Sequence, residues 1–444
     1  MAPILDMTPA TAADDDPPAD VRSAYASAGE AMQLLNVRRQ TLYAYVSRGL
    51  IRSVPQKGQK DRLYLRDDIR RVGMRSAARA GHGPVAASAM NWGEPIFPTS
   101  ITEITPQGPR YRGHLAADLV RQGMPFEAVA ELLWTGSMPA AAAVASDAPA
   151  WPVAEPGPEL LSLTATLAGL QARDNILETL ALVVLMLGMR RGPVAERLQQ
   201  GRTLPAAREI VQAAVACCGL IGPAQAYRPM RQGESIVDGL VQAFGMPASA
   251  ENREALRAIL ILMADHELPP GTLGARVVAS AGGTLHSCLA SALCATSGVE
   301  VGRMYERVEA FLGRPQRGGA LVQRAERLHA QGRSVPGFDH PLYPQGDPRA
   351  AQLLALARER REPGRELRAI FRFLDEIQAR AGLRPRQELA VVVLTRAMAL
   401  PPQAAAALFA LGRIAGWVAH VREQRAAGSL LRPRAKFVAA GTMP

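Results

Sequence analysis

Cysteine is scarce in this sequence, and the common metal and nucleotide signatures are missing. Four cysteines occur in 444 residues, and no two of them form a Cys-x-x-Cys pair. No Gly-x-Gly-x-x-Gly fingerprint, Walker Gly-Lys-Ser/Thr motif or metal-spaced His/Cys cluster is present. We therefore expect no metal and no resident cofactor. The apolar surroundings of the cysteines predict buried free thiols in a reducing compartment at Cys217, Cys218, Cys288 and Cys294.

Aromatic residues and long apolar runs are also few. Aromatics make up 5% of the chain, and alternating Val/Ile/Thr runs bounded by turns are nearly absent, whereas alanine, leucine and arginine are abundant. This composition predicts an all-α protein. The longest apolar run, 180–189, is far shorter than the ~20 residues that span a bilayer, and the N-terminus is acidic where a signal peptide is basic. We expect a cytoplasmic protein without a membrane partner.

Positive charge is concentrated near the N-terminus. Residues 1–20 carry five acids, no base and four prolines, which predicts a disordered acidic tail. Residues 21–80 carry thirteen Lys and Arg against four Asp and Glu, and this surplus of nine is most of the chain's net +11. Segment 81–91, rich in small residues, is typical of a linker. A basic block of this size favours a polyanion-binding module attached to a larger body.

The basic block contains two short amphipathic helical stretches joined by a tight turn. Ser27 and Glu30 have the spacing of a capping box that opens the first helix. Gly49 stands where the second helix is expected to end. Two such helices are typical of a helix-turn-helix, in which the second helix enters the major groove of DNA. The expected apolar positions are Ala31, Leu34 and Leu35 in the first helix and Leu42 and Val46 in the second.

This module resembles the winged helix-turn-helix domains of the MerR and excisionase type. The resemblance rests on TLYAYVSRGLI and RLYLRDDI, with SVPQKGQKDRLYL as a basic wing and DDIRRV opening a third helix. It implies binding to duplex DNA; the alternative is packing against the protein's own body or a partner protein. The residues expected to face DNA are Arg38, Arg39, Gln40, Thr41 and Tyr43, with Arg48, Lys57 and Lys60 directed toward phosphates.

The remaining sequence carries a series of segments in one order between about residue 95 and residue 440. They are SITEIT, YRG, FEAVAELLWTGSMP, ADHELPPGTLGARVVASAGGTLHS, GFDHPLYPQGDPRA, LFALGRIAGWVAHVREQ and LLRPRAKFV. Together they resemble the citrate synthase family. The resemblance implies a helical homodimer with a large domain, 92–300 and 389–440, and a small domain, 301–388. It also implies condensation of an acyl-CoA, usually acetyl-CoA, with an oxo acid such as oxaloacetate, followed by thioester hydrolysis.

The resemblance assigns one histidine and one arginine to the proline-stiffened loop 335–350. His340 would polarise the oxo-acid carbonyl, and Arg349 would bind a carboxylate bidentately. His266 matches a second oxo-acid-binding histidine, and Arg413 a second carboxylate clamp. Arg432 matches a third clamp, which the family offers across the dimer interface. CoA enters as a substrate.

The acyl-CoA side of the expected site departs from the family pattern. Val301 stands where a Gly-Pro-Leu-His-Gly-Gly stretch has the histidine that steadies the enol, and valine cannot form that hydrogen bond. Glu388 in PRQEL stands where the family has the aspartate that removes the α-proton, and Asp339 replaces a loop glycine. We expect His286 to be a packed residue. Glu300, whose protonated form could donate, is an alternative to the missing histidine.

Three functions fit these observations. The first is a divergent citrate-synthase-like enzyme, favoured by the intact set of histidines and arginines. The second is a DNA-binding regulator that keeps the oxo-acid site as a metabolite sensor, favoured by the basic module and by Val301. The third is a weakly catalytic subunit that assembles with a true synthase.

Overall fold

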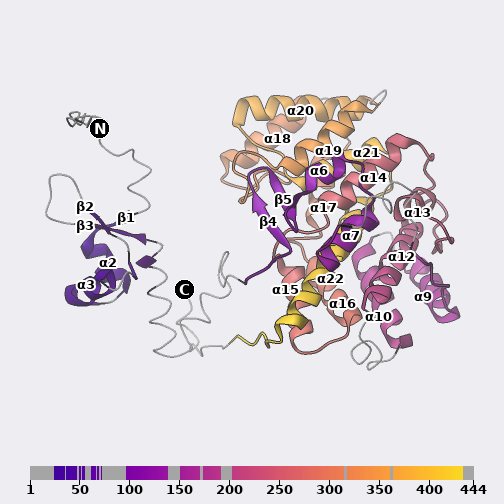
Figure 1. Ribbon diagram of the computed structural model, residues 1–444. Coiled ribbons are helices and arrows are strands. Elements are labelled where there is room, and N and C mark those ends of the chain that lie inside the picture. The colour runs from indigo at the N-terminus through magenta and orange to yellow at the C-terminus, as the bar shows by residue number, and fades with distance from the viewer. Residues whose placement is uncertain are drawn as a thin grey trace, which may run out of the picture. The chain divides into compact units, whose positions relative to one another are not determined.

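The structure is a computed structural model that describes residues 25–35, 37–47, 50–51, 53–55, 62–66, 68–69, 72, 97–138, 151–170, 174–191, 203–314, 318–360 and 364–433. Its contacts divide the chain into two units. The larger unit, residues 98–431, is called the body here; the other comprises residues 1–97 and 432–444 (Figure 1). The expected acidic tail, 1–20, and linker, 81–91, lie outside the described residues.

The N-terminal unit is a small winged helix-turn-helix. Its elements are β1 (Tyr25–Ala26), α2 (Ala28–Leu35), α3 (Arg39–Ser47), β2 (Ser53–Pro55) and β3 (Arg62–Leu65). The strands form an antiparallel sheet of order β1-β3-β2, in which β2 and β3 are the expected wing. The capping box is present, because the Ser27 amide donates to the Glu30 carboxylate at 3.0 Å and the Glu30 amide donates to Ser27 Oγ at 3.3 Å.

The core of this unit confirms all but one of the expected apolar positions. Leu42 is fully buried, and Val46 packs against the same cluster. Leu34, however, is 60% exposed, so its assignment to the inner face was wrong. The helix begins at Ala28, and the face that meets the core repeats at i, i+3 and i+7, which omits position 34. The α2 residues on that face are Ala28, Ala31 and Leu35.

The body begins with a small antiparallel sheet, a local exception to the all-α expectation. It consists of β4 (Thr102–Thr105), β5 (Gly108–Tyr111) and β6 (His114–Leu115) in sequential order. A two-residue turn joins β4 to β5, and Gly108 follows it with φ +114°, a backbone angle that favours glycine. Tyr111 is buried, and its hydroxyl donates to the Ile261 carbonyl at 2.9 Å. The sheet is thereby fixed to the helical core.

The rest of the described body is helical. Several helices begin at a side-chain cap, for example Ser249, whose Oγ accepts from the Asn252 amide. The helices are α6 (Ala116–Arg121), α7 (Phe126–Thr135), α9 (Pro158–Gly169), α10 (Ile176–Arg191), α12 (Thr203–Ile221), α13 (Ile236–Ala243), α14 (Ala250–Leu262), α15 (Pro270–Ser280), α16 (Leu285–Thr296), α17 (Met304–Leu312), α18 (Gly318–Ala330), α19 (Pro348–Glu359), α20 (Arg365–Ala381), α21 (Gln387–Ala397) and α22 (Ala404–Ala427).

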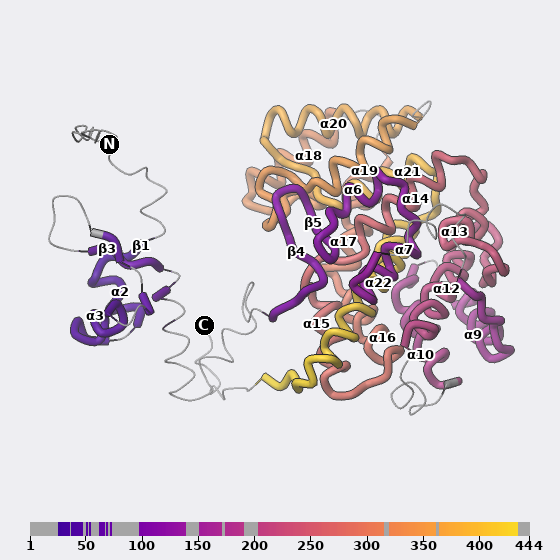
Figure 2. Tube along the Cα trace, in the orientation of Figure 1, coloured from indigo at the N-terminus to yellow at the C-terminus, as the bar shows by residue number. Residues whose placement is uncertain are grey.

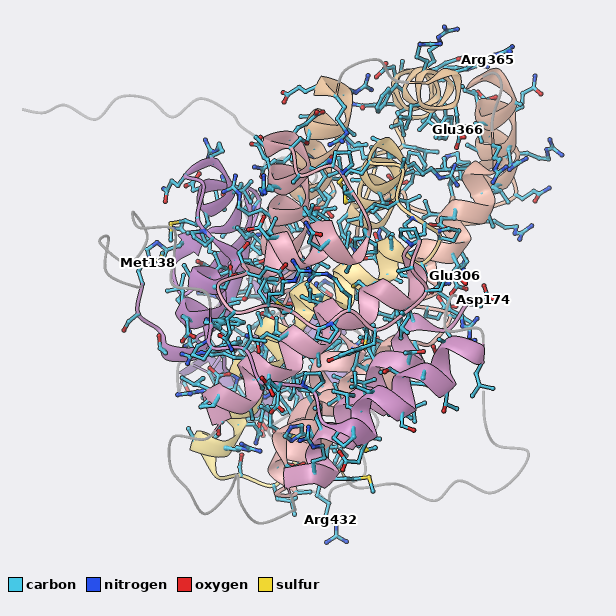
Figure 3. All side chains as sticks on the ribbon, turned by 90° about the vertical axis from the view of Figure 1, so that its right-hand side faces the viewer. Met138, Asp174, Glu306, Arg365, Glu366 and Arg432 are labelled. Carbon is cyan, nitrogen blue, oxygen red and sulfur yellow. The ribbon has the colours of Figure 1, made fainter. Side chains whose placement is uncertain are left out.

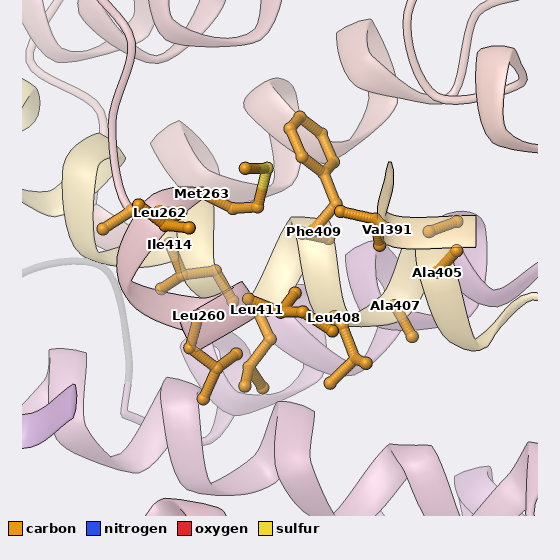
Figure 4. Packing of buried hydrophobic residues seen from close by; sticks show 14 of the residues in the cluster. Leu260, Leu262, Met263, Val391, Ala405, Ala407, Leu408, Phe409, Leu411 and Ile414 are labelled. Atoms are coloured by element: carbon orange, nitrogen blue, oxygen red, sulfur yellow. The ribbon is translucent and has the colours of Figure 1, made fainter. Parts of the chain in front are cut away.

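Helix α22 forms the centre of the body. Its residues from Ala404 to Val421 are buried on all sides, and it lies among α7, α14, α15 and α16 (Figure 2). The close-up in Figure 4 shows Leu408, Phe409 and Leu411 of α22 packed near Leu260 and other residues at the end of α14. A helix that is apolar around its whole circumference is stable only when it is enclosed in this way.

Helices α18 and α20 lie side by side at one end of the body, next to α19 (Figure 1). They fall within residues 301–388, the predicted small domain. The contact-based division leaves this region in the same unit as its surroundings. The boundaries between a large and a small domain therefore stay predictions.

One of the four cysteines is not buried as predicted. Cys217, Cys218 and Cys288 are buried as expected, but Cys294 is exposed, because it lies on the face of α16 that is turned away from the core.

Helices α12 and α22 are long and apolar enough to cross a membrane by length and composition. Both are enclosed by the body, and core helices pass the same test.

Candidate active site

Five of the six residues expected to bind or react with substrate belong to the body. His266 lies between α14 and α15, His340 lies on the loop that leads into α19, Arg349 lies in the first turn of α19, and Arg413 lies on α22. The ring centroids of His266 and His340 are 5.3 Å apart. Glu388 lies in the first turn of α21. Segments separated by more than a hundred residues therefore meet at one cluster.

The His340 loop is held by the segment before α21. The Asp339 amide donates to the Arg384 carbonyl at 2.8 Å, and the Asp339 carboxylate accepts from the Arg384 amide at 3.0 Å. Asp339 has φ +53°, where a glycine would be unstrained, and aspartate tolerates this conformation better than most residues. Its side-chain hydrogen bond explains how aspartate stands where the family pattern has glycine. The loop that carries His340 is thereby joined to the segment that carries Glu388.

The protonation state of His340 suits it to donate a hydrogen bond to a carbonyl. The Leu342 amide donates to Nδ1 of His340 at 3.1 Å, so the proton of the neutral ring lies on Nε2. Burial, followed by the charge of Arg349, lowers the pKa of His340 to about 4. The ring is therefore neutral at pH 7, with one fixed donor.

His266 is also neutral and is oriented by Tyr343. Its Nε2 lies 3.0 Å from the Tyr343 hydroxyl. Burial, followed by the charges of Arg349 and Arg413, holds the pKa of His266 well below its ordinary value. Burial also raises the pKa of Tyr343 to about 12, so this hydroxyl keeps its proton. Tyr343 was not among the residues expected from sequence, although it lies three residues after His340.

Arg349 is fixed along one edge of its guanidinium. Nε and Nη2 donate to the two oxygens of Asp347 at 3.0 and 2.8 Å, and both side chains are almost fully buried. Burial alone would lower the pKa of Arg349, but the charge of Asp347 outweighs it and raises that pKa. Asp347 occupies only the side edge of the guanidinium, which is formed by Nε and Nη2. The end edge, formed by the two Nη groups, retains donors with the geometry to hold a carboxylate bidentately.

Arg413 is a buried cation without an ion pair among the described residues. Its side chain is 3% exposed, its Nε donates to the Met263 carbonyl at 2.8 Å, and its guanidinium lies 4.9 Å from the centroid of the Phe409 ring. Burial lowers its pKa, and the charge of Asp265 partly offsets this effect. An unpaired buried charge is costly, so this position favours an anion at the free Nη groups.

Two glycines place Arg413 against the end of α14. A Cβ on Gly412 would lie 2.7 Å from the Leu260 carbonyl, and one on Gly416 would overlap the Ala264 carbonyl and the Asp265 carboxylate. The Gly416 amide donates to that Ala264 carbonyl at 3.0 Å. Helix α22 can therefore approach the segment that contains His266 closely enough for Arg413 to reach it.

Glu388 is paired with a cation that sequence reasoning missed. Arg386 donates from Nε and Nη2 to the two carboxylate oxygens at 3.2 and 2.8 Å. The charge of Arg386 also contributes to the low pKa values of His266 and His340, which places it at the same cluster. The spacing Arg386-x-Glu388 was visible in PRQEL, but nothing in the sequence indicated that the two side chains pair.

Neither Glu300 nor His286 is placed to substitute for the family histidine at Val301. Glu300 is 83% exposed and lies 3.8 Å from Arg307, so it is directed to solvent. His286 is buried, and a Cβ on Gly188 of α10 would lie 2.7 Å from it, as expected for a packed residue. Arg432 is exposed and follows the last residue of the body (Figure 3). Its contribution to a partner's site stays a prediction.

The described residues that are expected to face DNA lie on or next to α3. Arg38, Arg39, Gln40 and Tyr43 are exposed, and Thr41 is half-buried. Arg48, Lys57 and Lys60 lie outside the described residues. In the described segments, no group of three or more His, Cys, Asp or Glu side chains has the arrangement of a metal site.

The helical body thus brings two neutral histidines and two buried arginines to one cluster, and these donors and cations can hold an anionic molecule. Residues 90–434 match the family model described as "Citrate synthase, C-terminal domain", and residues 27–72 match that of a "Helix-turn-helix domain". Because the first match covers most of the chain, this protein belongs to the citrate synthase family.

Individual relatives agree with this family. The chain is 27% identical over 352 residues to "Putative citrate synthase 2" of Mycobacterium tuberculosis, covering 78% of this chain and 91% of that protein. It is 26% identical over 364 residues to "2-methylcitrate synthase 2" of Corynebacterium glutamicum, covering 76% and 91%. The fold matches a Thermoplasma acidophilum citrate synthase, solved with carboxymethyl coenzyme A and oxaloacetate, with a TM-score of 0.67 and 20% identity over 79% of this chain and 96% of that one.

Proposed function

We propose that the protein condenses an acyl-CoA, with acetyl-CoA as the first candidate, with a dicarboxylate oxo acid such as oxaloacetate. The observation that carries this proposal is the pair of buried guanidiniums of Arg349 and Arg413. Arg349 is held along its Nε and Nη2 side and Arg413 through Nε, so the end edge of each guanidinium keeps donors for a ligand. Two carboxylates on one small molecule would supply the anions that these groups favour. The names of the relatives support the same class of reaction.

The site residues have distinct roles in this reaction. The Glu388 carboxylate takes a proton from the α-carbon of the acyl group, and the resulting enolate attacks the oxo-acid carbonyl. His340 donates from Nε2 to the oxygen on which negative charge develops, and a donor fixed in advance needs no reorganisation. Arg349 and Arg413 hold the two carboxylates. Hydrolysis of the product thioester then releases CoA.

A thiol-release assay over a panel of acyl-CoA and oxo-acid pairs tests the proposal directly. Acetyl-CoA and propionyl-CoA with oxaloacetate are the first pairs, and the same acyl-CoAs with a monocarboxylate such as pyruvate are the controls. We expect release only with a dicarboxylate oxo acid. Release that is equal with pyruvate would contradict the assigned roles of the two arginines.

Oxo-acid binding can be measured separately from turnover. Oxaloacetate should raise the melting temperature, because it binds the folded state. Arg349→Ala or His340→Ala should remove most of that shift. Arg358→Ala is a matched control, because Arg358 forms an exposed pair with Asp375. No shift with any dicarboxylate at millimolar concentration would show that the site has been assigned wrongly.

The N-terminal unit favours a second function, binding to duplex DNA. The observation behind it is that Arg38, Arg39, Gln40 and Tyr43 are all exposed at the start of the second helix of a winged helix-turn-helix. A protein with both units would join metabolite binding to DNA binding. This function is compatible with the enzyme and also with the sensor alternative.

Salt-dependent gel-shift titration with the full chain tests this second function. If six phosphates are contacted, affinity should fall by about 10³ or more between about 50 and 200 mM salt, because phosphate contacts release counterions. Lys57→Ala should weaken all sequences alike and flatten that dependence, whereas Gln40→Ala should change the preference among sequences. Weak binding that is insensitive to salt and to both changes would assign the module to protein contacts.

A further inference from the structure

The condensation needs a hydrogen-bond donor at the thioester oxygen, and Val301 cannot provide it. Val301 lies in a turn before α17, where its amide donates to the Gly298 carbonyl at 3.1 Å. A Cβ on Gly302, the next residue, would overlap the Thr296 carbonyl, so the backbone of this turn is closely packed. Because Glu300 is directed to solvent and His286 is packed against Gly188, the donor has to come from another residue.

Tyr305 is buried in the first turn of α17, four residues after Val301. Its side chain is 2% exposed, and its hydroxyl donates to Oε1 of Gln387 at 2.9 Å. Gln387 directly precedes Glu388, and its amide donates to the Asp347 carboxylate that fixes Arg349. The Tyr305 hydroxyl is therefore bonded to the first residue of the helix that carries the base.

The Tyr305 ring and the Arg413 guanidinium both pack on the ring of Phe409. The ring centroids of Tyr305 and Phe409 are 5.2 Å apart, and the guanidinium of Arg413 lies 4.9 Å from the centroid of Phe409. Burial, followed by the negative charge of Glu388, raises the pKa of Tyr305 well above its ordinary value. The phenol therefore keeps its proton and can donate.

We propose that the Tyr305 hydroxyl is the hydrogen-bond donor to the enolate oxygen of the acyl-CoA. It would replace the histidine that the family has at the position of Val301. This inference rests on the proposed condensation. Glu388 takes the α-proton, the electrons of the C–H bond form the carbon–carbon double bond, and the carbonyl electrons move onto the thioester oxygen. Tyr305 turns its hydroxyl from Gln387 to that oxygen and donates without losing its proton.

Three variants separate a donor from a residue that only supports the fold. Tyr305→Phe keeps the ring and removes the donor, so turnover should fall about 10²- to 10³-fold. Gln387→Leu removes the other end of the same hydrogen bond but keeps the hydroxyl, so turnover should stay within about tenfold of wild type. In the Tyr305→Phe background, Val301→His should recover at least about tenfold, because it restores a donor from the neighbouring turn. Equal losses in Tyr305→Phe and Gln387→Leu would overturn the inference.

Binding of carboxymethyl-CoA provides a readout that does not need turnover. Its carboxylate places a charged oxygen near the position of the enolate oxygen. In the presence of oxaloacetate, calorimetry should show that Tyr305→Phe lowers the affinity for carboxymethyl-CoA by about tenfold or more, because a hydrogen bond to a charged group is lost. The affinity for CoA itself should not change. Unchanged affinity for carboxymethyl-CoA would contradict the role of Tyr305 even if the wild type turns over.

The two proposals fail in different ways. If oxaloacetate binds and the wild type releases thiol, but Tyr305→Phe stays within about threefold of wild type in both assays, only the Tyr305 inference is wrong. If no oxo acid binds and no thiol is released, the proposed condensation is wrong, and the role of Tyr305 falls with it.

Discussion

At the scale of single residues, the site depends on protonation states that burial and hydrogen bonds determine. The two histidines stay neutral beside buried guanidiniums, so each can donate a hydrogen bond without adding further positive charge. Asp347 gives Arg349 its orientation and its counter-charge. Each of these effects can be tested by changing one side chain.

Histidine titration predicts a loss of stability in mild acid. An unfolded histidine has a pKa of about 6.5, whereas that of folded His340 is about 4 and that of His266 is well below its ordinary value. Between these values the unfolded chain binds more protons, so the free energy of unfolding falls as pH falls from about 6.5. Urea titrations at pH 7 and pH 5 should show a smaller acid loss in His266→Asn than in wild type. Parallel losses would show that His266 is not the group that titrates.

Glu388 gives a second prediction at this scale. Glu388→Gln should reduce thiol release to below about 1% of wild type, because an amide cannot accept the α-proton, while oxaloacetate binding stays unchanged. Glu388→Asp should keep measurable activity, since it retains a carboxylate that is one methylene shorter. Equal rates for wild type and Glu388→Gln would remove this residue from the role of base.

The residues predictable from sequence were those inside contiguous motifs. His340 and Arg349 share one loop, and His266 and Arg413 lie in segments that match the family. Tyr305 and Arg386 could not be predicted in this way. Tyr305 is bonded to a residue on another segment, and the pairing of Arg386 with Glu388 depends on the rotamers of the two side chains. The partner of Tyr305 is 82 residues away along the chain.

At the scale of elements, Asp347 connects the N-termini of α19 and α21. It caps α19, its Oδ2 accepts from the Gln387 amide at 3.2 Å, and it holds Arg349. Helix periodicity predicts each helix separately but not this junction. The β4–β5–β6 sheet was missed for a similar reason. Its strands are only two to four residues long, and the Tyr111 hydroxyl bonds β5 to the end of α14, a contact that strand patterning does not predict.

Removing the Asp347 carboxylate should therefore destabilise the body strongly. Asp347→Ala leaves the buried Arg349 charge without its partner, which typically costs about 3–5 kcal/mol. Asp375→Ala is the matched control, because its pair with Arg358 is exposed and should cost less than about 1 kcal/mol. Urea denaturation followed by circular dichroism measures both changes. Similar losses in the two variants would contradict the importance of the buried pair.

At the scale of the whole molecule, an exposed apolar face on α10 is a candidate surface for the predicted homodimer. Leu182, Leu185 and Met189 of α10 are 48%, 41% and 78% exposed, and their spacing places them on one side of the helix. Apolar side chains gathered on one helix face often mark an interface. A dimer would also bring Arg432 of one chain toward the site of the other, as the family pattern implies.

Subunit complementation tests whether Arg432 acts across that interface. Arg432→Ala and His340→Ala should each be inactive as pure dimers. In a hybrid of the two, one site combines a native His340 from one chain with a native Arg432 from the other, while the second site carries both defects. Random assortment makes half of the dimers hybrids with one intact site each, so the mixture should recover about a quarter of wild-type thiol release. If Arg432 instead serves the site of its own chain, every hybrid site carries one defect, and mixing should recover nothing.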